Sequence, residues 1–247
     1  MSDFVHLHLH SEYSLLDGAC RISEIPAAAK RAGHTACAIT DHGAMYGAVA
    51  FYRACKKEGI KPIIGCEVYV APGDRHVREH SAFANSYHLV LLCKNEIGYR
   101  NLIYLVSEAF VSGFYSKPRI DMELLKSHHE GLIALSACLA GYIPRHIMSG
   151  EYDKAEKYAL EMKELFGEDF YLEVQDHGLP DQKTVNSAIF SMAEKLSIET
   201  VATNDVHYLR RADCEAQAIL LCIQTGSCIK DGRPIGFETD EFYYKET

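Results

Sequence analysis

The chain has 247 residues, enough for one sizeable domain, and its 48% hydrophobic and 24% charged residues are typical of a soluble globular protein. A net charge of −9 argues against a simple DNA-binding module, which is usually basic, but not against an enzyme that meets phosphates through bound cations. No run approaches the ~20 apolar residues of a membrane span, and no secretory signal opens the chain, so we expect a cytoplasmic protein without membrane contact.

Short apolar segments alternate with helical patterns along the chain. Strands are predicted at residues 4–9, 36–40, 62–70, 88–93, 132–136, 170–175 and 200–203. Helices are predicted at residues 23–32, 45–58, 97–110, 152–166 and 183–196, and residues 73–86 form a long polar loop. Seven strands in this alternation predict an α/β fold with a parallel sheet closed into a TIM-like (β/α)7 barrel. An open doubly wound sheet is the alternative, but no GxGxxG or Walker A loop supports it.

The nine cysteines do not indicate a disulfide framework. Their number is odd, no CxxC pair occurs, and Cys37, Cys66 and Cys93 lie inside apolar runs. Buried thiols in a reducing compartment are therefore expected.

The first predicted strand carries three histidines in alternation, His6-Leu7-His8-Leu9-His10. A regular strand would place the three imidazoles on one face and both leucines on the other. Three protonated imidazoles pointing together would repel one another, whereas a cation that binds neutral imidazoles removes that conflict. The motif therefore predicts a metal site.

Further groups that bind metals in proteins lie at or beside the later strands. They are Asp41 and His42, Glu67, His88, Cys138, and Asp205 with His207. Each has an ordinary explanation when taken alone, such as a helix cap for Asp41, but a charge such as Glu67 inside an apolar strand needs a partner. The carboxyl ends of barrel strands form the face that carries active sites, so the metal site is expected there.

Five long motifs resemble the polymerase and histidinol phosphatase (PHP) family of metal-dependent phosphoesterases. They are residues 6–18 (HLHLHSEYSLLDG), 40–43 (TDHG), 61–69 (KPIIGCEVY), 117–119 (KPR) and 202–208 (ATNDVHY). The resemblance is strongest to the branch at the N-terminus of bacterial DNA polymerase III alpha subunits, and residues 240–247 resemble its passage into the polymerase. The resemblance covers essentially the whole chain, so residues 1–247 are expected to form a single PHP domain without the polymerase part.

The resemblance implies a distorted seven-stranded barrel with a three-metal site. Carried over position by position, the metal ligands are His8, His10, Asp17, His42, Glu67, His88, Cys138, Asp205 and His207. The resemblance also implies 3′→5′ exonuclease activity in members that keep the full set, as this chain does. The mixed nitrogen, oxygen and sulfur ligands favour two or three divalent Zn, Mn or Fe ions. The catalytic group would then be a metal-bound water held by the same ligands, which would attack the phosphodiester.

Other polar residues are candidates for orienting ligands or binding substrate. They are His6, Asp41, Lys117, Arg119 and His177. Lys117 and Arg119 suit phosphate oxygens but could equally form surface salt bridges. The expected partners are the DNA 3′ end of a primer strand, and the polymerase portion of the same subunit or other replisome proteins.

Two alternative functions remain open from the sequence. The chain could be a small-molecule phosphomonoesterase of the histidinol phosphatase type, or a non-catalytic, metal-stabilised scaffold for a polymerase. Retention of nine ligand-competent residues argues against pure scaffolding, because a structural metal needs only about four ligands.

Overall fold

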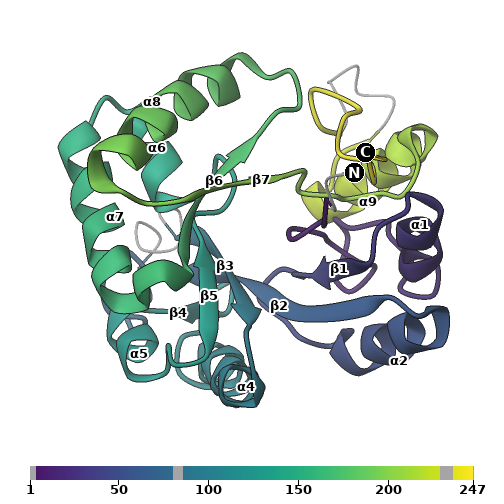
Figure 1. Ribbon diagram of the computed structural model, residues 1–247, viewed down its shortest axis with the longest axis horizontal. Coiled ribbons are helices and arrows are strands. Elements are labelled where there is room, and N and C mark those ends of the chain that lie inside the picture. Colours follow the sequence, from purple (N-terminus) through teal and green to yellow (C-terminus); the bar gives the residue numbers. More distant parts are fainter. Residues whose placement is uncertain (1–3, 80–85, 229–235, 247) are drawn as a thin grey trace.

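The computed structural model describes residues 4–79, 86–228 and 236–246. A seven-stranded sheet curls around the centre of the molecule, and helices lie outside it (Figure 1). The strands are β1 (Ala36–Ile39), β2 (Lys61–Val70), β3 (Tyr87–Cys93), β4 (Arg119–Ile120), β5 (Leu132–Leu135), β6 (Phe170–Gln175) and β7 (Thr200–Thr203). They follow the order β1-β2-β3-β5-β6-β7, with β4 paired to the end of β2. The predicted α/β class is confirmed, whereas the predicted closed (β/α)7 barrel is matched only in part, because no ladder among the described residues joins β1 to β7 and the sheet is a curled half-barrel.

One strand runs against the others, so the prediction of a wholly parallel sheet is wrong. β3 pairs antiparallel with both β2 and β5, whereas β1–β2, β5–β6 and β6–β7 are parallel. Parallel strands need a crossover, usually a helix. Within residues 71–79 and 86, the described part of the connection from β2 to β3, no helix occurs.

The predicted first strand, residues 4–9, is not a regular strand. Residues 6–10 occupy the gap between β1 and the segment after β7 (Figure 1). The Ala38 amide donates to the carbonyl of His6 (2.8 Å), and the His10 amide donates to the carbonyl of Val206 (2.7 Å). The chain bends at His8, so the predicted two-sided alternation fails. The seventh strand is instead the short β4.

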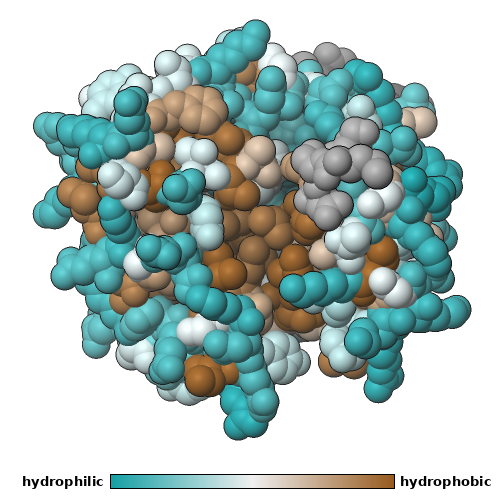
Figure 2. All heavy atoms as spheres, viewed as in Figure 1, coloured by the Kyte–Doolittle hydropathy of each residue, from teal (hydrophilic) through white to brown (hydrophobic). Residues whose placement is uncertain are grey.

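Two apolar layers follow from the alternation of side chains along the strands. Leu89 and Leu91 of β3 point outward and pack against the covering helices. Val90 and Leu92 point inward and pack with Leu135 at the centre of the curled sheet. Figure 2 shows a hollow lined by hydrophobic residues in the middle of the face seen in Figure 1.

Within the residues that the structure describes, the helices agree with the predicted patterns, and three more occur. They are α1 (Ile25–Arg31), α2 (Ala48–Glu58), α4 (Glu96–Val111), α5 (Met122–Ser127), α6 (Tyr142–Met148), α7 (Tyr152–Phe166), α8 (Pro180–Leu196) and α9 (Cys214–Thr225). Prediction missed α5, α6 and α9; the first two are too short for a clear helical period. α2 ends at Gly59, whose φ of 75° needs the freedom of glycine.

The structure also bears on the cysteines, on membrane-spanning helices and on the predicted long loop. All nine cysteines are described, and no disulfide joins them. No helix within the described ranges is long and apolar enough to cross a membrane. Of the long loop predicted at 73–86, residues 80–85 lie outside the described residues.

Candidate metal centre

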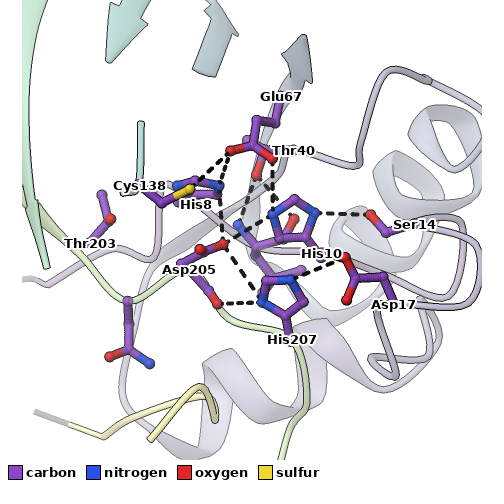
Figure 3. A network of polar contacts seen from close by, with 12 residues as sticks. His8, His10, Ser14, Asp17, Thr40, Glu67, Cys138, Thr203, Asp205 and His207 are labelled. Carbon is purple, nitrogen blue, oxygen red and sulfur yellow. Dashed lines mark hydrogen bonds and ion pairs between the residues drawn. The ribbon is translucent and has the colours of Figure 1, made fainter. Parts of the chain in front are cut away.

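The nine predicted ligands converge at one end of the curled sheet. Figure 3 labels His8, His10, Asp17, Glu67, Cys138, Asp205 and His207 among them. His42 and Cys138 follow β1 and β5, and Asp205 follows β7, as predicted for carboxyl ends of strands. His88 is the exception, because it lies at the start of β3. The reversed direction of β3 brings its amino end to the same end of the sheet.

Glu67 of β2 lies among five of the other predicted ligands, including His10, whose Nε2 lies 3.7 Å from its Oε2. Its Oε2 lies 2.6 Å from His42 Nδ1, and its Oε1 lies 3.0 Å from His88 Nδ1 and 3.3 Å from His8 Nε2. The Cys138 sulfur lies 3.8 Å from Oε1. This buried carboxylate therefore faces imidazole and thiol groups from separate strands.

Two further carboxylates connect the remaining imidazoles. Asp205 Oδ1 lies 3.1 Å from His10 Nε2 and 3.2 Å from His8 Nε2. Asp17 Oδ2 lies 2.9 Å from His42 Nε2 and 3.7 Å from His207 Nε2. Asp205 adopts a φ of 44°, a left-handed conformation that costs a non-glycine residue about 1–2 kcal/mol. The backbone is thus strained where this carboxylate is aimed at the centre.

Five buried polar atoms at the centre lack a well-formed hydrogen bond, and their arrangement shows whether metal ions would fit there. They are His8 Nε2, His10 Nε2, His42 Nδ1, Glu67 Oε2 and Asp205 Oδ1, which form no well-formed hydrogen bond among the described residues and instead face one another in ion-pair contacts of 2.6–3.2 Å. Three overlapping groups lie close enough to share an ion: His8–His10–Glu67, His42–Glu67–His88 and His10–His42–His207. Buried charged groups need partners, and divalent cations would pair with all five atoms at once. The residues present therefore fit bound metal ions.

Burial and neighbouring charges strongly shift the pKa values of the groups in the cluster. Burial and the neighbouring His42 and His207 lower the pKa of His10 to about 3, which keeps this imidazole neutral. Burial alone would lower the pKa of His42, but the charges of Glu67 and Asp17 raise it to about 10. Burial would raise the pKa of Asp17, yet His207 and His42 hold it well below its usual range. Without cations, a protonated imidazole balances the carboxylates.

A second layer of polar groups fixes the orientation of His8 and His10. The Nδ1–H of His8 donates to Glu173 Oε1 at 2.7 Å, and the amide of Gln175 donates to the same oxygen at 2.9 Å. The carboxylate of Glu173 also accepts a hydrogen bond from the hydroxyl of Thr203. The Nε2 atom of His8 is therefore left free to face the centre, the usual arrangement for a metal-binding histidine.

His10 is oriented through a serine and a carboxylate. Its Nδ1–H donates to Ser14 Oγ (2.9 Å), whose hydroxyl donates to Asp41 Oδ1 (2.9 Å). The Asp41 carboxylate thus holds Ser14 against the predicted ligand His10, and its role in orienting a metal ligand stays a prediction. The alternative role, a cap for the following helix, is wrong because Gly47 is the N-cap of α2.

Glu173 and Ser14 were not predicted from the sequence. Glu173 is buried in β6, in the run FYLEVQ, so the signal used for Glu67 was present here also: an acidic residue inside an apolar strand. Ser14 gave no comparable signal, since its role depends on how the loop after His10 folds back.

The remaining predicted residues do not all reach the centre. His6 lies against the Tyr244 ring (4.1 Å) and its Nε2 donates to the Lys245 carbonyl (3.0 Å). Arg119 is fully buried, donates to carbonyls of residues 75, 77 and 113, and does not line the pocket beside the cluster. Lys117 lies 4.3 Å from the ring of Tyr69, on the His88 side of the cluster.

His177 packs behind the cluster and does not line the pocket beside it. Its Nε2–H donates to the carbonyl of Asn204 (2.9 Å), next to the ligand Asp205, and its ring stacks on Phe242 (3.8 Å). Phe242 in turn lines a pocket of about 250 Å³ beside the ligands. The other walls are Asp17, His42, His88, Cys138, Leu139, Ala140, Gln175, Leu179, Gln182, Asp205, His207 and Phe237.

Fold and site together define an α/β protein with a curled sheet and a buried centre of imidazoles and carboxylates able to hold metal ions. The sequence profile of the PHP domain matches residues 6–177, more than half of the chain. The chain belongs to the PHP domain family.

Curated relatives place the chain within one branch of that family. It is similar to DNA polymerase III subunit alpha of Treponema pallidum (51% identity), Borreliella burgdorferi (46%) and Thermus aquaticus (44%), each over 98–99% of this chain. The aligned region is only 20–21% of those proteins, so the chain spans about a fifth of their length.

Two solved structures share the fold at low identity. One is a metal-dependent phosphoesterase candidate from Bifidobacterium adolescentis, with a TM-score of 0.52 and 14% identity over 84% of this chain and 88% of that chain. The other is an amidohydrolase from Chromobacterium violaceum, with a TM-score of 0.53 and 17% identity over 82% of this chain and 87% of that one.

Proposed function

We propose that the chain is a metal-dependent phosphoesterase that acts as the 3′→5′ exonuclease, or proofreading, domain of a bacterial replicative polymerase subunit. The observation that carries the proposal is the convergence of buried imidazole nitrogens and carboxylate oxygens into three overlapping groups, each close enough to hold one ion. A structural metal needs only about four ligands, so a scaffold alone does not require a cluster of this size.

The cofactors proposed are two or three divalent Zn, Mn or Fe ions. Their ligands would be His8, His10, Asp17, His42, Glu67, His88, Cys138, Asp205 and His207. Such ions, when bound, polarise a phosphodiester and lower the pKa of water towards ~7.

The protein's own residues hold and orient this ligand set. Glu173 keeps the proton of His8 on Nδ1, and Ser14 with Asp41 does the same for His10. Lys117 would contact a substrate phosphate at the mouth of the site, as its ammonium lies beside Tyr69 and near the ligands. These contacts position the groups before substrate arrives.

Direct attack by Cys138 is disfavoured. Burial and the charges of Glu67 and Asp205 raise the pKa of this thiol well above its usual value. A thiol that stays protonated is a poor nucleophile. Cys138 therefore suits the role of ligand, beside a cation, better than that of attacking group.

The proposal treats residues 1–247 as one domain. The matched family region ends at residue 177, yet Asp205 and His207 complete the centre, and the backbone of Val206 pairs with that of His8 and His10. The proposed partners are the 3′ end of a DNA primer and the polymerase portion of the same subunit or other replisome proteins, in the cytoplasm; the curated relatives are replicative polymerase subunits.

The test follows a 5′-labelled primer with a 3′ mismatch, incubated with the metal-loaded chain with and without chelator. Stepwise shortening from the 3′ end that chelator abolishes is the expected result. An intact primer, at confirmed metal occupancy, would overturn the exonuclease function. Hydrolysis of a small phosphomonoester would then favour the phosphatase function. If chelator only lowers Tm, and no substrate is cleaved, the domain is a metal-stabilised scaffold.

A further inference from the structure

The pocket beside the ligands has an apolar wall that metal binding does not use. Leu139, Leu179, Phe237 and Phe242 are the large apolar residues that line its volume of about 250 Å³, and Phe237 and Phe242 lie next to the predicted ligand His207. A phosphate group alone would find only apolar contacts on this wall, so the wall suits a flat, weakly polar part of a substrate.

Phe237 is the half-buried aromatic residue of this wall. Its ring lies 4.8 Å from the His207 ring in an edge-to-face arrangement (84°) and 4.3 Å from the Phe242 ring. Phe242 is held from beneath, since its ring stacks on buried His177 (3.8 Å, 22°) and its carbonyl accepts the His207 amide (2.8 Å). The Phe237 ring is therefore supported by the well-packed ring of Phe242, and it directly contacts the ring of His207, a proposed ligand.

The opposite side of the cluster is cationic. Lys117 lies over Tyr69 (4.3 Å), whose ring contacts His88 (5.1 Å). The cluster thus separates a positive charge on the His88 side from an aromatic wall on the His207 side. A nucleotide residue has both complementary parts, a phosphate and a flat base.

We propose that the wall formed by Leu139, Leu179, Phe237 and Phe242 is a subsite for the terminal nucleobase of a single-stranded DNA 3′ end, with Phe237 as the stacking residue. The inference rests on the proposed function and deepens it, because it names the substrate as a nucleic-acid end. Stacking accepts every base, since each has a π face. The subsite is therefore indifferent to sequence and favours unpaired ends, whose terminal base is free to leave the duplex stack.

The experiment compares two single-stranded oligonucleotides, one with a normal 3′ nucleotide and one with a stable abasic 3′ residue. Hydrolysis (kcat/KM) is measured for the wild-type chain, Phe237→Ala, Phe237→Leu, which keeps apolar bulk without a flat face, and Phe237→Tyr. Phe190→Ala, at an exposed position of α8, is the matched control. Binding is measured in parallel with phosphorothioate-terminated versions of both oligonucleotides.

Phe237→Ala and Phe237→Leu should lower kcat/KM and affinity about 10-fold for the normal end and leave the abasic end unchanged. Phe237→Tyr should retain the preference for a base, and Phe190→Ala should change nothing. Equal effects on both ends, or no effect on either, would overturn the subsite. If the wild-type chain cleaves neither oligonucleotide, the proposed function fails. The binding measurements then test the subsite alone. Tighter binding of the normal end than of the abasic end, lost in Phe237→Ala and Phe237→Leu, would support it, and equal binding of both ends by the wild-type chain would overturn it.

Discussion

The two ends of the curled sheet are built from opposite kinds of side chain. At one end, imidazoles and carboxylates converge, and five of their buried atoms lack a well-formed hydrogen bond among the described residues. At the other end, Leu7, Ile63, Leu92, Ile133, Leu135 and neighbouring residues line an apolar hollow of about 590 Å³. Figure 2 shows a hydrophobic hollow of this kind in the face towards the viewer.

The same inward rows of side chains serve both ends. Along β3 the inward positions are His88, Val90 and Leu92. Along β2 the predicted ligand Glu67 is preceded, four residues earlier, by Ile63. Four residues of strand span only about 13 Å. Chemistry and stability therefore depend on different residues of the same strands, and substitutions should separate them.

The largest expected effect is at the polar end. Asp205→Asn removes a charge that contacts His8 and His10, and should lower kcat by roughly 100-fold or more while the circular dichroism spectrum stays unchanged. Asp153→Asn, at an exposed position of α7, is the control. Wild-type turnover in Asp205→Asn would show that the cluster is not the catalytic centre.

The apolar end should respond in the opposite way. Leu135→Ala removes a buried side chain from the centre of the curled sheet and should lower the free energy of unfolding by about 2–3 kcal/mol. Its kcat, measured well below Tm, should stay within about twofold of wild type, as should that of Leu160→Ala, an exposed position. A large loss of activity at full folding would mean that the two ends are coupled.

A smaller effect is expected from the second layer of the polar end. Glu173→Gln keeps an acceptor for His8 Nδ1 but removes the negative charge that raises the basicity of this ligand. Metal affinity, measured by competition with a chelator, should fall about 10-fold without a change in fold. Glu194→Gln, at an exposed position of α8, is the control and should leave the metal affinity unchanged. An unchanged metal affinity in Glu173→Gln would show that His8 does not bind metal.

The smallest effect concerns pH and His6, which lies outside the centre. Burial lowers the pKa of His6 to about 4, below its ordinary value of 6.5. The unfolded chain therefore binds a proton between pH 6.5 and 4 that the folded chain does not, so this group makes stability fall as pH falls through that window. In urea titrations at pH 7 and 4.5, His6→Gln should lose less stability than wild type. An equal loss would show that another group causes the acid sensitivity.

Much of the polar cluster that the structure brings together was readable from local sequence, and its role as a ligand set stays a prediction. His42, Cys138 and Asp205 follow apolar strands directly, and an acidic residue such as Glu67 inside a buried strand needs a partner. The same rule applied to β6 would have found Glu173. The positions of the longer helices, such as α7 at Tyr152–Phe166, were also set by local periodicity.

The sequence by itself determined which residue types stand at the strand ends and where most strands and helices lie, because alternation and helical period are local properties. Only the tertiary structure decided the reversed direction of β3, which brings His88 into the cluster, since strand pairing depends on contacts distant in the chain. It also separated His6 from His8 by a bend and buried Arg119 beneath loop carbonyls. The partners that a polar side chain finds depend on how distant segments pack, and no local pattern records that packing.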